Sequence, residues 1–387
     1  MKNSFKIENT EILLDFSLLE VNDIEISSMP YNYTVRFINA NEAKEQISNI
    51  VQLNGDKHFV FIDKEVAEIY GCEFFDKQDL LTLTAEEDNK VLDVATILLD
   101  KLQEKNFTKK ELFLSVGGGI TQDISAFGRA VYKRGINWVY FPTTLLAMGD
   151  SCIGAKSCLN YGHVKNQLGL FSAPKEVYIN IDFLNSLDKR DVLSGYGEII
   201  KLAIVGGSKS LSIFSDLIAP QGEDKLKNID QLIKLSLLVK KSVIEIDEFE
   251  DNIRRALNYG HTVGHAIEPL TDYKIPHGIA VSIGVVVENL ISAEYGQLPL
   301  NDAIYINNMV LSFIDELSLS YLQDISVDAI VENMKRDKKT MNTDVFMAVP
   351  FNIGYFDMVK VPIDSKFKIF LKDALDSIIN LKNNSSK

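Results

Sequence analysis

The chain has 387 residues, of which 46% are hydrophobic and 24% charged, so it can bury a sizeable core and form two domains. Its 54 acidic and 40 basic residues give a formal net charge of -14 at pH 7, which argues against nucleic acid or an anionic membrane as a partner. An anionic ligand would have to bind in a local basic pocket.

Cysteine usage and hydropathy indicate the compartment. Three cysteines without zinc-ribbon spacing are typical of reduced thiols. The first ten residues lack the apolar core of a signal peptide, and the longest uncharged apolar run, residues 275–287, is too short to cross a bilayer of about 30 Å as a helix. We therefore expect a cytoplasmic protein with no membrane span.

The first half of the chain has the pattern of a parallel sheet. Residues 25–28 and 34–39 predict a small strand pair. Further along, short apolar runs alternate with amphipathic segments, such as residues 86–105, as in βαβ units. These runs are residues 58–63, 80–84, 112–116, 138–141 and 177–181.

The second half is predicted to be mainly helical. Helical periodicity covers residues around 190–205, 228–247, 252–267 and 278–296, and a strand signal returns at 346–350. The predicted fold class is therefore α/β plus all-α. We expect a nucleotide-binding α/β domain over residues 1–186 and a helical domain over residues 187–387, with a site in a cleft between them.

Three glycines, Gly117 to Gly119, follow a buried strand and open a helix. Glycine lets backbone N–H groups approach a pyrophosphate, and a helix N-terminus favours negative charge. A purely structural turn is the alternative. Asp123 could accept a bond from a ribose hydroxyl or simply lie in the first helical turn, and Thr143 and Thr144, at the next strand end, could face the same ligand or cap a helix.

Three of the five histidines, His261, His265 and His277, lie close together in the sequence. Three histidines so close together indicate a metal- or anion-binding site rather than histidines that are only hydrogen-bonded in the core. A catalytic zinc site usually has three protein ligands, and Glu198 is the candidate carboxylate. Spacing alone favours His261 and His265 as the metal-binding pair, because they are four residues apart on one helix face.

Basic and polar residues recur beside these motifs, although each lysine taken singly could be ordinary surface charge. Together they indicate a clamp for a phosphate or a carboxylate. They are Asp150, Lys156, Lys165, Asn166, Lys240, Arg254 and the lysines of the run RDKK at 336–339.

The ordered motifs resemble 3-dehydroquinate synthase and the wider sugar phosphate cyclases over about residues 60–350. The motifs are GGGITQD, FPTTLLAMGDS, GAKS, KNQLG, GYGEIIK, NYGHTVGHAIE, HGIAV and DKK. The resemblance implies a Rossmann-like NAD-binding domain, a helical metal-binding domain and a homodimer.

The resemblance also implies roles for individual residues. Zn2+ or Co2+ would be bound by Glu198, His261 and His277, in place of the pair that spacing favours. Catalytic roles fall on Asp150, Lys201, Glu250, Asn258 and His265. Substrate contacts fall on Arg134 (toward the neighbouring subunit), Lys156, Asn166, Lys240, Arg254, Lys338 and Lys339, with one of the last two in contact. NAD contacts fall on Asp63, Glu87, Lys90, Gly118, Gly119, Asp123, Thr143, Thr144 and Lys165.

The implied reaction converts a phosphorylated sugar acid, 3-deoxy-D-arabino-heptulosonate 7-phosphate (DAHP), into 3-dehydroquinate and phosphate, a step of the shikimate pathway to aromatic amino acids. NAD would oxidise a ring hydroxyl that zinc polarises, phosphate would leave by elimination, and the same NADH would return its hydride before an intramolecular aldol closure.

Some motifs depart from the usual family pattern. GAKS replaces the usual GGKT, and GITQDISAF replaces the usual GxxGDLAGF type. The loop NYGHVKNQLG differs from the usual NHPxGKNxIG loop. These departures keep a specialised cyclase as an alternative, acting on sedoheptulose 7-phosphate or making an amino-dehydroquinate-type product. A metal-dependent alcohol or glycerol dehydrogenase is the more distant alternative.

Overall fold

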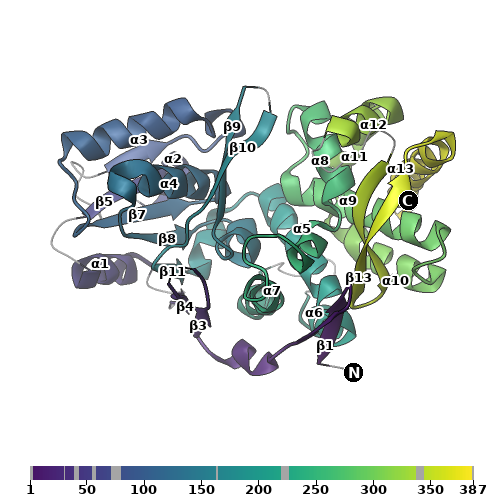
Figure 1. The fold of residues 1–387 in the computed structure, drawn as a ribbon, viewed down its shortest axis with the longest axis horizontal. Coiled ribbons are helices and arrows are strands. Elements are labelled where there is room, and N and C mark those ends of the chain that lie inside the picture. The colour runs from purple at the N-terminus through teal and green to yellow at the C-terminus, as the bar shows by residue number, and fades with distance from the viewer. Residues whose placement is uncertain are drawn as a thin grey trace. The chain divides into compact units, whose positions relative to one another are not determined.

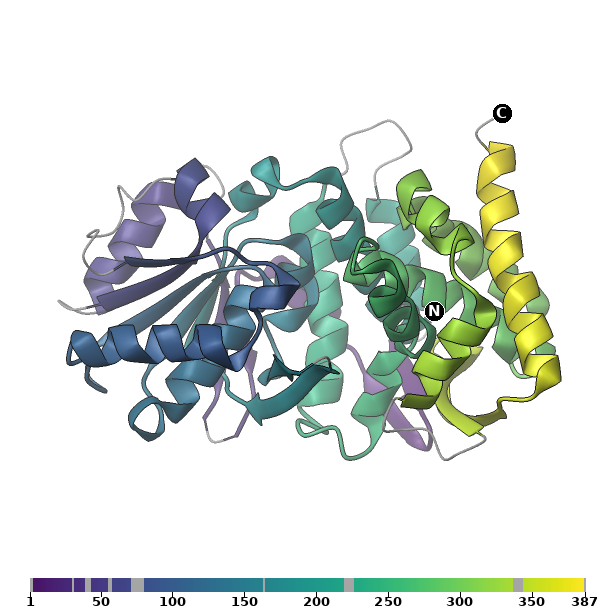
Figure 2. The ribbon, with the colours of Figure 1, turned by 90° about the horizontal axis from the view of Figure 1, so that it is seen from above.

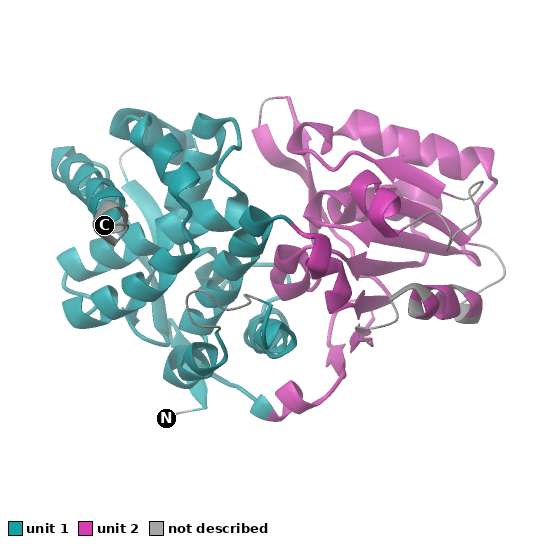
Figure 3. Ribbon diagram, turned by 180° about the vertical axis from the view of Figure 1, so that it is seen from behind, with its two compact units in different colours: residues 1–16, 188–387 teal, residues 17–187 magenta. Residues whose placement is uncertain are grey.

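The computed structural model describes residues 3–29, 31–38, 43–54, 58–70, 80–162, 164–218, 226–336 and 344–385. The predicted substrate residues Lys338 and Lys339 lie outside the described residues. The chain divides into two compact units (Figure 3). One unit is Ser17–Leu187, and the other combines Met1–Phe16 with Asp188–Lys387.

The Ser17–Leu187 unit is built on a sheet in which the described residues form seven strands, in the order β3-β4-β11-β8-β7-β5-β6 (Figure 1). All neighbours are parallel except β3 and β4, so the predicted parallel sheet is confirmed. The strands are β3 (Asp23–Ile26), β4 (Tyr33–Phe37), β5 (His58–Asp63), β6 (Leu80–Leu83), β7 (Leu112–Gly117), β8 (Trp138–Pro142) and β11 (Glu176–Ile179).

Helices cover both faces of this sheet (Figure 2). Every residue of β7 and β8 is therefore buried, which explains why these strands are continuous apolar runs. In α3, Ala95, Leu98 and Leu102 recur at helical spacing and are buried. The helices are α1 (Ala43–Asn54), α2 (Lys64–Tyr70), α3 (Leu92–Glu104) and α4 (Gly119–Val131).

A two-stranded antiparallel ribbon, β9 (Lys156–Tyr161) and β10 (Val164–Phe171), was not anticipated from the sequence. β9 packs against α4, and Ser157 Oγ donates a hydrogen bond to the Asp123 carbonyl oxygen at 2.8 Å. The ribbon thereby brings the segment after β8 back to the helix that follows the glycine turn.

The second unit is mainly helical, as predicted. Its helices are α5 (Lys189–Val205), α6 (Gly207–Leu217), α7 (Ile229–Ile244), α8 (His261–Ile267), α9 (His277–Glu294), α10 (Leu300–Val310), α11 (Glu316–Gln323), α12 (Val327–Arg336) and α13 (Ser365–Ser385). It also contains a sheet with the order β12-β13-β1-β2 among the described residues. These strands are β12 (Asp344–Asn352), β13 (Tyr355–Pro362), β1 (Ser4–Ile7) and β2 (Thr10–Leu13).

The first 16 residues correct the predicted domain extents, because they belong to the helical unit rather than to the α/β unit. β1 pairs in parallel with β13, with Ile7 opposite Phe356, and Phe5 and Ile7 are buried. Four-residue strands carry too little periodicity for this placement to be read from the sequence. The division after Leu187 lies one residue beyond the predicted boundary.

The predicted helix over residues 252–267 is broken. A 3-10 segment, Ile253–Asn258, is followed by Gly260 in a left-handed conformation (φ 80°), and α8 begins at His261. A Cβ on Gly260 would lie 2.7 Å from the Val281 carbonyl oxygen, so the break also permits close packing of α8 against α9.

α9 is the described helix that is long and apolar enough to cross a membrane by length and composition alone. However, 78% of this 18-residue segment is buried inside the structure. Such burial is typical of a core helix, and α9 contacts α5, α8 and α10.

Candidate active site

The carboxyl ends of β5, β7 and β8 bring predicted cofactor residues to one edge of the sheet. Gly118 and Gly119 directly follow β7, which lies between β5 and β8. The Thr143 backbone N–H donates to the Gly117 carbonyl oxygen at 3.1 Å, so the ends of β7 and β8 lie side by side. A Cβ on Gly118 would lie 2.9 Å from Thr144 Cγ2, so this approach requires glycine. Ligands of parallel sheets typically bind at this edge.

Asp63, at the end of β5, caps the helix that follows it. Its Oδ1 accepts hydrogen bonds from the backbone N–H groups of Glu65 and Val66 at 2.8 and 3.2 Å. Burial raises the pKa of this carboxyl, and the two hydrogen bonds lower it by less, so the net shift is upward.

Five predicted site residues form one hydrogen-bonded and ionic cluster, which we call the Lys90 network: Glu87, Lys90, Asp123, Lys165 and Asn166. Lys90 Nζ lies 3.2 Å from Asp123 Oδ2, 2.8 Å from Asn166 Oδ1 and 3.6 Å from Glu87 Oε1. Lys165 Nζ lies 3.6 Å from Glu87 Oε2. The network joins residues predicted for NAD with one, Asn166, predicted for the substrate.

The charges in this network balance one another. Burial lowers the pKa of Lys90, but the carboxylates of Asp123 and Glu87 raise it by more. Burial raises the pKa of Asp123, although Lys90 opposes the shift. Asn160 was not predicted: its Nδ2 donates to Glu87 Oε1 at 2.8 Å and its Oδ1 accepts from the Asn166 backbone N–H at 3.0 Å. In the sequence, only the position of Asn160 in NYGHVKNQLG, the segment that differs from the usual family loop, pointed to a role in the site.

Three other predicted residues of this unit lie outside the seven-stranded sheet. Asp150 is in a π-helical turn, Ala147–Ser151, after β8. Lys156 is exposed at the start of β9. Arg134 is exposed at φ 61° in the turn after α4. The structure therefore brings together the glycine turn and the Lys90 network, and it puts Arg134 on the surface.

Glu198 lies in the middle of α5, although Gly195 and Gly197 just before it in the sequence would suggest a helix start there. α5 begins at Lys189, and the Asp188 side chain caps it by accepting from the Arg190 backbone N–H. The helix is buried along most of its length, so Glu198 is fully buried. Lys201, one turn later and 2% exposed, places Nζ 2.5 Å from Glu198 Oε2.

The histidine cluster, His261, His265 and His277, converges from α8 and α9, with candidate ligand atoms within 4.8 Å of one another. Glu198 Oε1 lies 3.2 Å from His277 Nε2 and 3.5 Å from His261 Nε2. The side chain of His265 is 44% exposed, with Nε2 4.0 Å from Glu268 Oε2. The buried carboxylate thus contacts the two histidines that the family resemblance selects, whereas sequence spacing selects His261 and His265.

Neighbouring charges shift the pKa values of Glu198 and of the two histidines that it contacts. Burial raises the pKa of Glu198, but Lys201 and the two histidines hold it well below its usual value. Burial and the Lys201 charge lower the pKa of His261 well below normal. Burial also lowers the pKa of His277, but Glu268 and Glu198 raise it to about 10. A positive charge is therefore favoured beside Glu198 Oε1.

Glycines next to the site residues allow the three helices to approach. A Cβ on Gly197 of α5 would lie 2.0 Å from the Gly278 carbonyl oxygen of α9, and one on Gly278 would lie 1.8 Å from the Ser194 oxygen. A Cβ on Gly264 of α8 would lie 2.9 Å from the Ala280 oxygen. Each of these glycines neighbours a candidate site residue, so the close contacts position Glu198, His277 and His265 directly.

The remaining predicted residues of this unit lie on α7 and on the segment leading into α8. Lys240 and Arg254 are buried, at 7% and 3% exposure. Asn258 Nδ2 donates to Glu250 Oε1 at 2.5 Å. Asp247 holds this segment by accepting backbone hydrogen bonds from residues 251, 252 and 254, each at 2.9 Å.

Two buried carboxylates near the cluster were missed by sequence reasoning. Glu288 on α9 accepts from the Gly260 backbone N–H at 2.7 Å, which holds the start of α8. Glu268 Oε2 lies 3.3 Å from His277 Nδ1. Glutamates are common enough that only the folded chain distinguishes these two, although Glu268 does end the motif NYGHTVGHAIE.

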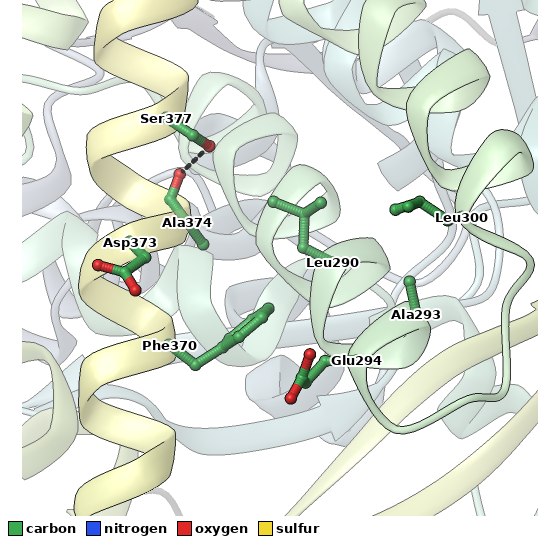
Figure 4. Close-up of a pocket in the computed structure, with 8 residues that line it drawn as sticks. All are labelled: Leu290, Ala293, Glu294, Leu300, Phe370, Asp373, Ala374 and Ser377. Atoms are coloured by element: carbon green, nitrogen blue, oxygen red, sulfur yellow. Dashed lines mark hydrogen bonds between the residues drawn. The ribbon is translucent and has the colours of Figure 1, made fainter.

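A separate cavity of about 320 Å³ lies among α9, α10 and α13 (Figure 4). Its lining is largely apolar, with Leu290, Leu300 and Phe370, and includes the carboxylates of Glu294 and Asp373. This composition does not suit a phosphorylated anion, so the cavity is not the candidate active site.

Comparisons with known proteins agree with the two-unit fold. The family model for the 3-dehydroquinate synthase N-terminal region matches residues 80–194, and that for the C-terminal region matches residues 195–340. The 3-dehydroquinate synthase of Thermoanaerobacter sp. (strain X514) is 35% identical over 292 residues, which cover 74% of this chain and 80% of that protein.

Two solved structures share the fold at 22% identity. One is 2-deoxy-scyllo-inosose synthase complexed with carbaglucose-6-phosphate, NAD+ and Co2+ (TM-score 0.78, covering 91% of this chain and 99% of the other). The other is 2-epi-5-epi-valiolone synthase from Streptomyces hygroscopicus subsp. jinggangensis 5008 with NAD+ and Zn2+ bound (TM-score 0.74, 92% and 98%). From the family models and the sequence identity, the chain belongs to the 3-dehydroquinate synthase family of sugar phosphate cyclases.

Proposed function

We propose that the protein is a 3-dehydroquinate synthase, a carbon-oxygen lyase that converts DAHP into 3-dehydroquinate and phosphate. The observation that carries the proposal is the convergence of Glu198 with His261 and His277, in a unit that also buries Lys240 and Arg254. The name carried by relatives such as the Thermoanaerobacter protein supports the same activity. The protein would act in the cytoplasm as a homodimer.

The donor set of Glu198, His261 and His277 fits a divalent metal such as zinc. Both oxygens of Glu198 are buried, and among the described residues neither has a hydrogen bond of ordinary geometry. His261 Nε2 and His277 Nε2 lie within 3.5 Å of Glu198 Oε1. One carboxylate and two imidazoles form a common catalytic zinc site with an open position.

The glycine turn and the end of β8 fit NAD. Gly118 and Gly119 leave backbone N–H groups accessible at the N-terminus of α4, where a pyrophosphate is favoured. The Lys90 network would supply hydrogen-bonding groups beside this turn. Asp63, Thr143 and Thr144, which are also predicted to contact NAD, lie at the carboxyl ends of β5 and β8, on either side of the glycine turn.

When bound, NAD would accept a hydride from the ring carbon that carries the hydroxyl and later return it, and the metal would polarise the hydroxyl oxygen as its proton leaves. Glu198 and Lys201 form a buried ion pair next to this position, so these two charges would already be in place as charge develops on the substrate. Lys240 and Arg254 would hold the substrate carboxylate and phosphate. Asn258 and Glu250, already hydrogen-bonded to each other, would orient substrate hydroxyls. His265, the exposed member of the cluster, would contact phosphate.

A specialised sugar phosphate cyclase is the second candidate. The sequence of residues 160–166 departs from the usual loop of dehydroquinate synthases. Asn166 from this stretch belongs to the Lys90 network, and Asn160 hydrogen-bonds to two members of that network, Glu87 and Asn166. The solved relatives that share the fold include cyclases named for other products.

One assay separates the candidates. Purified full-length protein with NAD and zinc is given DAHP, sedoheptulose 7-phosphate or a simple alcohol such as glycerol, and phosphate, NADH and carbocyclic product are followed. Phosphate release from DAHP with no net NADH is expected. Turnover of sedoheptulose 7-phosphate alone would transfer the assignment to the second candidate. Net NADH from an alcohol without phosphate release would indicate a dehydrogenase instead. Glu198→Gln serves as the inactive control.

A further inference from the structure

The carboxylate of Glu268 contacts the histidine cluster without belonging to the proposed ligand set. Glu268 begins the 3-10 segment after α8 and is only 3% exposed. Its Oε2 lies 3.3 Å from His277 Nδ1 and 4.0 Å from His265 Nε2. Glu198 contacts the same His277 ring through the other nitrogen, Nε2. The ring therefore lies between two buried carboxylates.

This contact fixes which nitrogen of His277 faces Glu198. An ionised carboxylate only accepts hydrogen bonds, so Nδ1 must carry the proton that it donates to Glu268. His261 has a parallel arrangement, since its Nδ1 faces the Tyr259 carbonyl oxygen at 3.1 Å and its Nε2 faces Glu198. Both rings thus present Nε2 to the same carboxylate oxygen. Hydrogen bonding of the second nitrogen is the usual way in which a protein orients an imidazole ligand.

The two outer partners differ in charge. The Tyr259 carbonyl is neutral, whereas Glu268 is a carboxylate. A charged acceptor makes the stronger hydrogen bond and increases the basicity of the opposite ring nitrogen. Nε2 of His277 is therefore expected to donate its electron pair to a metal more strongly than Nε2 of His261 does. The orientation of the His277 ring depends on one side chain, whereas that of His261 depends on a backbone carbonyl.

We propose that Glu268 is a positioning residue that orients His277 through Nδ1 and raises the affinity of the site for a divalent metal. This inference rests on the metal site of the proposed function, and it adds a residue outside the ligand set. Its effect is on metal binding itself, so it can be measured without the reaction.

The test compares the full-length wild type with Glu268→Gln and Glu268→Ala. Zinc affinity is measured by competition with a chromogenic chelator, the Co2+-loaded proteins give a visible absorption spectrum, and the melting temperature of the metal-free proteins reports folding. Zinc should bind about 10-fold more weakly to Glu268→Gln and about 100-fold more weakly to Glu268→Ala, with an altered Co2+ spectrum. Glutamine has nearly the same shape as glutamate, so this variant is expected to fold.

Asp315→Asn is the matched control, because Asp315 is a largely buried carboxylate of the same unit that bonds Ser318 and Arg190. It should lower the melting temperature and leave zinc affinity unchanged. Zinc affinities of both Glu268 variants within twofold of wild type, or an equal loss in the control, would overturn the proposal. If His277→Ala bound zinc as tightly as wild type, the metal site of the proposed function would itself be wrong.

Discussion

The two units assemble their candidate sites in different ways. In Ser17–Leu187, backbone groups at adjacent strand ends form the glycine turn, and each strand carries its own motif. In the helical unit, Glu198, His261 and His277 come from three helices that touch through glycines. The first site therefore depends mainly on local backbone conformation, whereas the second depends on how closely α5, α8 and α9 pack. Perturbing packing should therefore damage the second far more than the first.

The largest expected effect is that of Gly278→Ala. The added Cβ would lie 1.8 Å from the Ser194 carbonyl oxygen, a backbone atom that cannot move independently of α5. We expect a loss of more than about 3 kcal/mol in the free energy of unfolding, measured by urea denaturation. Gly119→Ala is the control, because its Cβ would have only Ser151 Oγ nearby, at 3.9 Å. Equal stabilities for the two variants would contradict the difference drawn between the units.

Next in size is the effect of removing single histidines. His277→Ala should lose bound metal on dialysis, because it removes one of the proposed metal ligands, the ring in contact with Glu198. His265→Ala should retain metal and bind phosphate more weakly, because this exposed ring is outside the proposed ligand set. Metal content is measured by elemental analysis. The opposite result would favour the pair His261 and His265 suggested by sequence spacing.

A smaller effect is expected from Gly119→Ala on cofactor binding. The extra methyl group would keep the ligand away from the backbone N–H groups at the start of α4 while leaving the fold intact. NAD should bind roughly 10-fold more weakly, comparable to losing one hydrogen bond to a charged group, as measured by calorimetry. Unchanged NAD affinity would argue that the glycine turn is only structural.

The smallest effect concerns Asp247, whose hydrogen bonds in the helical unit join residues close together in the sequence. Burial raises its pKa, but three backbone hydrogen bonds lower it by more, so the folded value is below the unfolded one. Its contribution to stability is therefore present above the unfolded pKa, about 4, and is lost as pH falls through the folded pKa.

Asp247→Asn should cost about 1 kcal/mol of unfolding free energy at pH 7. The difference from wild type should stay constant down to about pH 4 and shrink below it. Urea denaturation across this range measures it. A difference independent of pH down to the acid transition would exclude the charge as the cause.

Much of the fold follows from the sequence alone. The five apolar runs predict the parallel strands, because strands covered on both faces need continuous apolar residues. The glycine turn is predicted for a similar local reason. The placement of β1 and the break before α8 could not be predicted, because partners far away in the chain, β13 and Glu288, determine them.

For the site, the amino-acid sequence provides the residue types and the motif series. The family resemblance implies Glu198, His261 and His277 as one ligand set, but the folded chain was needed to show that Glu198 contacts both histidines, that Lys90 contacts Asp123 and Asn166, and that Glu268 contacts His277. Helical spacing predicts neighbours on one helix only, whereas these contacts join side chains from separate elements. Glycine-mediated approach of three helices then sets distances that no local pattern encodes.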